Sequence, residues 1–336
     1  MDNTIKTGIL SYGMSGQLFH SPFVDAHEGY ELTAVVERSQ KRAHLKYPDI
    51  KSYDSVDLLM ADDQIELVIV NTPNTTHFEF ALKALQMGKH VLVEKPFTVT
   101  PAEAEKLFVV ARENDRRVLP YQNRRFDSDF LSVKKVLDSG KLGRLVEVHF
   151  RFDRYKYEIG KKAAKETAVA GSGLLFDLGP HLLDQAISLF GMPLRWTKTL
   201  GHFRPGTQVD DYAHLHLSYP GELQVFITVS LLVADAQPAF VLHGTKGSFI
   251  KNRTDVQEDQ LLENRSPKDP LYGLEKENQQ GILTTMAEDG TKRVERIAAS
   301  KSTYLNMFDA VYRTIRESEP YPIAEEEVLK QLEILK

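Results

Sequence analysis

The first part of the chain shows short apolar runs that alternate with stretches of helical periodicity. Unbroken runs of β-branched and other apolar residues are typical of strands buried on both faces, as in a parallel sheet. The expected strands cover residues 5–10, 31–36, 67–70, 90–93 and 117–121, and helical patterns run to Val24 and cover 55–60, 79–87 and 101–114. This alternation predicts an α/β fold with a doubly wound parallel sheet.

After residue 121 the pattern changes to strands joined by short turns. The expected strands cover 144–154, 195–203, 211–219, 222–232, 239–242 and 247–251, and helical patterns cover 128–139, 302–317 and 324–335. Such runs of strands predict an α+β domain with an open, mostly antiparallel sheet. Residues 255–290 are polar, and we expect an irregular loop there. We therefore predict one domain over residues 1–121 and a second, for substrate binding and oligomerisation, over 122–336.

One expected strand of the second domain has two different faces. Its apolar side chains lie on one face, and Tyr212, His214 and His216 lie on the other. The second face is either wet or an oligomer interface, and we favour a homodimer or homotetramer through this sheet. Two histidines without a third ligand are a weak metal site, so we predict no metal.

Composition excludes several classes of function. The 336 residues carry a net charge of −5 with both signs mixed, so there is no basic face for nucleic acid and no polybasic segment for a membrane. No apolar run approaches the ~20 residues of a membrane span, and the polar N-terminus is unlike a signal peptide. The absence of cysteine excludes disulfides and a thiolate nucleophile. We expect a soluble, cytoplasmic protein.

A glycine-containing turn follows the first expected strand and precedes a helix. It consists of Ser11, Tyr12, Gly13, Met14, Ser15 and Gly16. Strand, turn and helix in this order are the context of a dinucleotide fingerprint, in which the pyrophosphate rests on the helix N-terminus. Ser11 stands at the first glycine of that fingerprint, and a plain helix-capping turn is the alternative interpretation.

The residues after the second strand bear on the choice of cofactor. Glu37 lies about twenty residues beyond the turn, where an acidic residue can bind the ribose hydroxyls of NAD. Arg38 follows directly and suits the 2′-phosphate of NADP. The sequence leaves NAD and NADP both open.

Polar residues also leave the next two strands at the same edge of the sheet. Asn71, Thr72 and Pro73 follow one strand, and Glu94, Lys95 and Pro96 follow the other. Ligands of open α/β sheets bind beyond the carboxyl ends of the strands, so we expect these residues at the cofactor. Asn74 and His77 are either further cofactor contacts or parts of a turn, and Glu94 and Lys95 are otherwise solvated loop charges.

A second cluster of chemically useful residues lies between Gly171 and Asp184. Asp177 and His181 are four residues apart and therefore within one helical turn, although Pro180 kinks that helix or starts a new one. A histidine with a nearby carboxylate is a natural general base or acid near neutral pH. The alternative is a core histidine beside a helix-capping aspartate.

These motifs together resemble the Gfo/Idh/MocA family of glucose–fructose oxidoreductases and inositol dehydrogenases, over nearly the whole chain. The resemblance is carried by GMSG at residues 13–16, NTP at 71–73, GKHV at 88–91, EKP at 94–96 and DLGPHLLD at 177–184. FHSP at 19–22 and NRRFDSDF at 123–130 are similar to the branch of NADP-dependent scyllo-inositol dehydrogenases. Residues 154–171 lack the Arg-Pro and Arg-Trp pattern of that branch.

The resemblance implies an N-terminal Rossmann domain and hydride transfer between NAD or NADP and a sugar or polyol such as an inositol. It implies that Lys95, Asp177 and His181 are catalytic and also bind substrate. Asn123 is expected at both cofactor and substrate, and the further expected substrate contacts are Arg124, Tyr155, Tyr157 and Lys161. A non-catalytic dinucleotide-binding regulator, or a reductase of another substrate class, stays possible on the same fold.

Overall fold

The computed structural model describes residues 3–160 and 166–336. These residues form two compact units, and each unit is discontinuous in sequence. The first unit runs to Asn123 and also contains residues 260–272 and 303–333. The second contains residues 124–259, 273–302 and 334–336. The chain thus returns to the first unit twice after residue 123.

The first unit is built on a six-stranded parallel sheet with strand order β3-β2-β1-β4-β5-β6. The strands are β1 (Ile5–Ile9), β2 (Tyr30–Val36), β3 (Lys51–Tyr53), β4 (Leu67–Val70), β5 (His90–Val93) and β6 (Val118–Pro120). The order reverses at β1, where β2 lies on one side and β4 on the other, and this reversal is the switch point of a doubly wound sheet. All four residues of β4 are buried, as their apolar run predicts. The short strand β3 is a finding that the sequence pattern did not indicate.

The helices of the first unit come from both ends of the chain. The N-terminal part supplies α1 (Ser21–Ala26), α2 (Val56–Met60), α3 (His77–Gln86) and α4 (Pro101–Glu113), and the C-terminal part supplies α9 (Leu305–Arg316) and most of α10 (Glu325–Leu335). Within this unit α9 packs on α1, where Phe308 stacks on Phe23 with ring planes 5° apart. The Tyr30 hydroxyl also donates to the Phe308 carbonyl at 2.6 Å.

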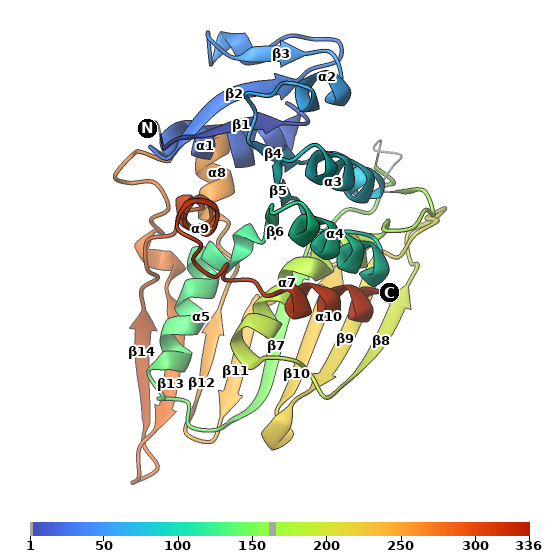
Figure 1. Ribbon diagram of the computed structural model, residues 1–336. Coiled ribbons are helices and arrows are strands. Elements are labelled where there is room, and N and C mark those ends of the chain that lie inside the picture. Colours follow the sequence, from blue (N-terminus) through green and yellow to red (C-terminus); the bar gives the residue numbers. More distant parts are fainter. Residues whose placement is uncertain (1–2, 161–165) are drawn as a thin grey trace. The chain divides into compact units, whose positions relative to one another are not determined.

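The second unit is an eight-stranded open sheet with order β14-β13-β12-β11-β7-β10-β9-β8 (Figure 1). Its strands are β7 (Leu145–Asp153), β8 (Arg195–Gly201), β9 (Tyr212–Ser218), β10 (Gln224–Ser230), β11 (Phe240–Gly244), β12 (Gly247–Lys251), β13 (Gly281–Met286) and β14 (Lys292–Ile297). Only β7 and β10 pair in parallel, so the expected mostly antiparallel sheet is confirmed. The helices α5 (Ser128–Asp138) and α7 (Leu174–Phe190) lie along one face of this sheet (Figure 1).

The prediction of an irregular loop over residues 255–290 is wrong in part. This region contains the helix α8 (Val256–Leu262) and the strand β13, which forms a hairpin with β14 at the edge of the sheet. An edge strand buries few side chains, and β14 is exposed or half-exposed throughout. The alternation of apolar and polar residues that reveals a strand is therefore weak in this hairpin.

Candidate functional site

A cavity of about 890 Å³ opens beyond the carboxyl ends of β1 and β2 in the first unit. Its wall includes eight of the residues expected to bind a cofactor. They are Ser11, Tyr12, Gly13, Met14, Glu37, Arg38, Thr72 and Pro73. The sequence reasoning missed Ser39, Gln40 and Arg42, which also line this cavity. The signal for them was the continuous polar run after β2, which extends the Glu37-Arg38 pair.

The turn after β1 is held by a close approach of the backbone at Gly16. A Cβ atom at this position would overlap the carbonyl oxygen of Ser11, so only glycine fits. The Asn71 side-chain amide also donates to that carbonyl at 2.8 Å, which ties the turn to the end of β4. Ser11 itself is not among the residues with positive φ, so serine is tolerated where the fingerprint has its first glycine. Its hydroxyl accepts from the Gly13 amide at 3.4 Å.

The Glu37 carboxylate is bound by the loop that follows it and by β3. It accepts from the amides of Arg42 at 2.7 Å and Ala43 at 3.2 Å, and from the Ser52 hydroxyl at 2.8 Å. A carboxylate offers about four acceptor sites, so these donors leave little capacity for the ribose hydroxyls. The side chains of Arg38 and Arg42 are exposed at the cavity, and no ion pair of either is found in the part of the chain that the structure describes.

Glu94 follows β5, and its carboxylate connects two loops of the first unit. Oε1 accepts from the Ser15 hydroxyl at 2.9 Å and lies 2.9 Å from Nε2 of His20, while Oε2 accepts from the Lys95 backbone amide at 3.2 Å. Burial raises the pKa of Glu94, but His20, Lys95 and Ser15 outweigh it and hold the pKa at about 2. An ionised carboxylate therefore joins the glycine turn after β1 to the segment that carries Lys95.

The structure places His77 away from the cavity wall. Its imidazole is buried, and the two ring nitrogens lie 2.8 Å from the carbonyl oxygens of Pro96 and Thr72. The ring is thus directed to these two carbonyls, as the alternative interpretation of a structural turn suggests. Asn74 begins a short 3-10 helix, Asn74–Thr76, directly before His77. Asn123 is buried at the start of another 3-10 helix, Asn123–Phe126.

In the second unit, Asp177 and His181 lie one turn apart on α7. The helix runs without interruption from Leu174 to Phe190 and contains Pro180, so the proline does not start a new helix. Asp210 fixes the first turn, because its carboxylate accepts from the Leu175 amide at 2.6 Å and its carbonyl accepts from the Leu174 amide. The pair thus has the helical spacing that the sequence predicts. Lys95 belongs to the first unit, and its meeting with this pair at one site stays a prediction.

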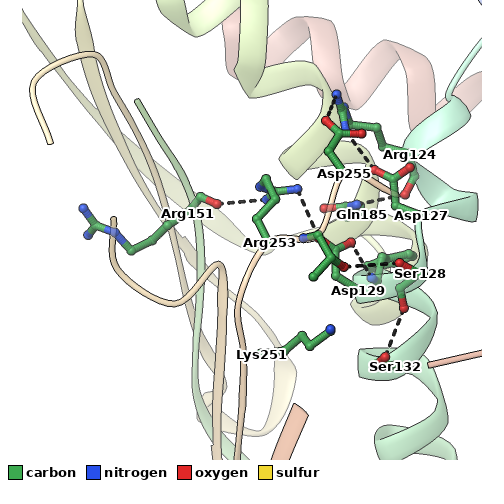
Figure 2. Close-up of polar contacts among 12 residues, drawn as sticks. Arg124, Asp127, Ser128, Asp129, Ser132, Arg151, Gln185, Lys251, Arg253 and Asp255 are labelled. Carbon is green, nitrogen blue, oxygen red and sulfur yellow. Dashed lines mark hydrogen bonds and ion pairs between the residues drawn. The ribbon is translucent and has the colours of Figure 1, made fainter. Parts of the chain in front are cut away.

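Arg124 lies in a buried ion cluster of the second unit (Figure 2). Its guanidinium is 2.9 Å from the carboxylates of Asp127 and Asp255 and 3.3 Å from that of Glu258. Gln185 on α7 donates to the Arg124 carbonyl at 3.0 Å. These contacts tie the segment that follows Asn123 to the helix of Asp177 and His181, whereas substrate binding by Arg124 stays a prediction.

Arg253 occupies the centre of the same cluster (Figure 2). It donates to the Arg151 carbonyl at 2.9 Å, lies 3.7 Å from the Asp129 carboxylate and stacks 4.1 Å from the centroid of Phe152. Burial lowers the pKa of Arg253 and raises that of Asp129.

The remaining expected contacts and the two histidines of β9 belong to the second unit. Tyr155 pairs with Leu232 in an isolated bridge, and the side chains of Tyr155 and Tyr157 are exposed. Lys161 lies outside the described residues. His214 and His216 bond to Thr228 and Gln224, respectively, and both rings stack on Phe226.

Two family models match this chain. One, described as an oxidoreductase family with an NAD-binding Rossmann fold, matches residues 5–122, and the Gfo/Idh/MocA C-terminal domain matches residues 130–250. The NADP(+)-dependent scyllo-inositol 2-dehydrogenase IolW of Bacillus subtilis is 35% identical over 333 residues, which cover 99% of this chain and 92% of IolW. The chain belongs to the Gfo/Idh/MocA oxidoreductase family.

Other oxidoreductases match with similar coverage. The uncharacterised oxidoreductase YdgJ of Escherichia coli is 35% identical over 318 residues, which cover 95% of this chain and 89% of YdgJ. The crystal structure of an oxidoreductase from Bacillus cereus has a TM-score of 0.90 at 32% identity, with 99% of this chain and 95% of that chain covered. The family and the Rossmann fold that the sequence indicated are confirmed.

The first unit of this Gfo/Idh/MocA protein fits a nicotinamide dinucleotide, NAD or NADP. The glycine turn after β1 stands where the pyrophosphate rests in a dinucleotide-binding fold, and the 890 Å³ cavity at this turn is also lined by the polar groups after β2. Within residues 3–160 and 166–336, every helix is too short or too polar to cross a membrane.

Proposed function

We propose that this protein is an NAD(P)-dependent dehydrogenase that acts on a CH–OH group of a sugar or cyclitol, with hydride transfer to or from the nicotinamide. The observation that carries this proposal is the Asp177–His181 pair, one turn apart on α7, in a chain that also has Lys95 two residues after the end of β5. Membership of an oxidoreductase family and the similarity to a scyllo-inositol dehydrogenase support a polyol substrate.

The three proposed catalytic side chains divide the chemistry of alcohol oxidation. The bound nicotinamide supplies the hydride acceptor. His181 takes the hydroxyl proton, because a neutral imidazole is a base near neutral pH. The Lys95 ammonium holds the substrate oxygen and stabilises the negative charge that grows on it. Asp177 accepts from a neighbouring hydroxyl group and orients the substrate against His181.

The test is an assay with a panel of inositols and aldoses, with each cofactor, followed at the absorbance of the reduced nicotinamide. The variant Lys95→Ala is expected to lose turnover by roughly 100–1,000-fold, which is typical for loss of one stabilising group, while cofactor affinity is kept. Lys268→Ala, which removes an exposed lysine of the same unit, is the control. Full turnover by Lys95→Ala, or no turnover of any substrate by a protein that binds cofactor, would refute the proposal.

We also propose that the enzyme prefers NADP. The bonds that Glu37 accepts from the 42–43 amides and from Ser52 turn its carboxylate into an anchor of the loop. Lys41 is neutralised by Asp54 at 2.7 Å, whereas Arg38 and Arg42 present guanidinium groups at the cavity. Guanidinium groups bind phosphate with two parallel hydrogen bonds, and only NADP offers a 2′-phosphate there.

Calorimetric titration with both cofactors tests this preference. Arg38→Ala and Arg42→Ala are each expected to weaken NADP binding by about 10–100-fold, the value of a charged hydrogen bond, and to leave NAD binding nearly unchanged. From sequence alone, Glu37→Ala should weaken NAD binding selectively. The structure instead predicts that Glu37→Ala weakens the binding of both cofactors. The loop that carries both arginines then loses the carboxylate that accepts from its backbone amides. Tighter binding of NAD than of NADP by the unchanged protein would contradict the preference.

We propose further that the protein forms a homodimer or homotetramer through the C-terminal sheet. Phe226 carries stacked imidazoles of His149, His214 and His216 on the sheet face opposite the buried core residues. In the same row across the sheet, three and four strands away, the apolar side chains of Ile250 and Ile282 are 39% and 40% exposed, respectively. Light scattering on Phe226→Glu should report a smaller species, with Leu45→Glu, at an exposed site of the other unit, as control.

A further inference from the structure

His77 has a set of contacts that a neutral imidazole cannot make. Nδ1 lies 2.8 Å from the Pro96 carbonyl oxygen, and Nε2 lies 2.8 Å from the Thr72 carbonyl oxygen. A carbonyl oxygen only accepts, and a neutral imidazole has one N–H group. One of the two close contacts would then set a nitrogen lone pair against an oxygen lone pair. Two donated bonds at this distance require the imidazolium form.

The two carbonyls belong to the segments that leave neighbouring strands. Thr72 follows β4 and Pro96 follows β5, and these strands pair in parallel with Val70 opposite Val93. Pro96 is the residue directly after Lys95. His77 is the first residue of α3, so the helix, the exit of β4 and the exit of β5 meet at one ring. His77 is only 1% exposed, so its ring is removed from water.

We propose that His77 is a positioning residue that fixes the Lys95 backbone by donating from both ring nitrogens to the carbonyls after β4 and β5. The inference rests on the proposed catalytic role of Lys95. It explains why a histidine occupies this buried first position of α3, whose N-cap is Thr76. A side chain with only one donor leaves one of the strand exits without its bond.

The charged groups that act on His77 are Glu94 and Lys95. Burial is the largest influence and lowers the pKa of His77, while the two carbonyls and the Glu94 carboxylate favour the imidazolium and the Lys95 ammonium opposes it. Glu94 is itself bonded to Ser15 and lies against His20. The same carboxylate thus supports the cation on His77 and holds the Lys95 amide.

The decisive measurement is the protonation state of the ring. Long-range ¹H–¹⁵N spectra of histidine-labelled protein distinguish an imidazolium from either neutral tautomer, and the signal that disappears in His77→Gln identifies the residue. Because burial lowers the pKa of His77, we expect two protonated ring nitrogens at pH 5 in the wild-type protein. A ring that stays neutral between pH 5 and pH 8 would overturn the proposal.

Kinetics supply an independent test of positioning. His77→Leu, which has no donor, is expected to lower kcat roughly 10–100-fold, the effect of a shift of about 1 Å in a catalytic group, with cofactor affinity changed less than about twofold. His77→Gln, whose amide has two N–H groups, should recover part of that loss. His90→Gln is the control, because His90 begins β5 at the end opposite Lys95.

The outcomes separate this inference from the proposed function. If Lys95→Ala abolishes turnover but His77→Leu keeps its kcat, His77 does not position Lys95 and the inference falls alone. If Lys95→Ala retains turnover, the proposed function fails, whereas the spectra still report whether the ring carries two protons. Equal losses of kcat in His77→Leu and His90→Gln would mean a general effect on the fold and would also overturn the inference.

Discussion

Replacement of Lys251 by methionine would break a buried ion pair of the second unit. The Lys251 side chain is fully buried, and its ammonium donates to both Glu275 oxygens at 2.9 and 2.8 Å and to the Gln279 carbonyl. Glu275 also accepts from the hydroxyls of Ser128, at 2.7 Å, and Thr254. All three donors of the ammonium are used, so no water is needed to satisfy it.

The magnitude follows from what remains after the substitution. Removing one partner of a buried pair costs about 3–5 kcal/mol, because the other charge stays buried. The two hydroxyls still compensate Glu275, which favours the lower part of that range, about 3 kcal/mol. The Gln279 carbonyl loses a donor, which adds about 1 kcal/mol. Methionine fills the space of the lysine stem, so no cavity term is added. We expect Lys251→Met to lose about 4 kcal/mol of unfolding free energy.

The assay is urea unfolding followed by tryptophan fluorescence. The chain has one tryptophan, and Trp196 lies in β8 of the second unit, so its signal reports the unit that contains Lys251. With a slope of about 2–3 kcal/mol per molar urea, the midpoint should fall by roughly 1.3–2 M. Lys246→Met, at an exposed site before β12, should stay within about 0.5 kcal/mol of the unchanged protein.

A double variant tests whether the buried charge of Glu275 causes the loss of stability. Lys251→Met with Glu275→Gln removes the orphaned charge and leaves an acceptor for Ser128, so it should recover at least half of the lost stability. A single variant within about 1 kcal/mol of Lys246→Met would show that the pair is not desolvated. A double variant less stable than the single one would show that lost packing, and not the buried charge, dominates.

Two further predictions concern acid stability and backbone strain. Because the folded pKa of Glu94, about 2, lies below its ordinary value of 4.5, its stabilisation is present above pH 4.5 and is lost as the pH falls toward 2. Thermal melting of Glu94→Gln should therefore change less between pH 6 and pH 3 than that of the unchanged protein, and parallel curves would contradict this. Gly273→Ala should cost roughly 2–5 kcal/mol, because Gly273 has a φ of +74° and a Cβ would overlap the Ser302 carbonyl. Gly290→Ala, with a φ of +81° and open space around it, should cost only about 1 kcal/mol in the same urea assay, and equal losses would refute the role of the overlap.

Much of the fold could be predicted because its signals are local. The buried strands β4 and β5 are continuous apolar runs, and such runs are distinctive when both faces of a sheet are covered. The hairpin of β13 and β14 escaped prediction because an edge strand buries little and needs little apolar sequence. The packing of α9 in the first unit also could not be predicted. An amphipathic helix indicates that one of its faces is covered, but not which element covers it.

The candidate site also has parts that the sequence predicts and parts that it does not. The glycine turn, the strand exits and the spacing of Asp177 and His181 are set by short stretches of sequence, so residue type and spacing alone indicate them. The bonds of Glu37 to the 42–43 amides and to Ser52 could not be predicted, because β3, which carries Ser52, pairs with β2 only in the folded sheet. The same holds for Arg124, whose partners Asp255 and Glu258 lie more than a hundred residues away.

The sequence by itself determined which chemical groups this protein has and the end of the strand or helix on which each stands. The tertiary structure decided which of those groups are already bound to other parts of the protein. Glu37 and His77 show the difference: both have the right type for a cofactor contact, yet one holds a loop and the other faces two carbonyls. The physical reason is that a buried donor or acceptor must find a partner, and that partner can come from any part of the chain.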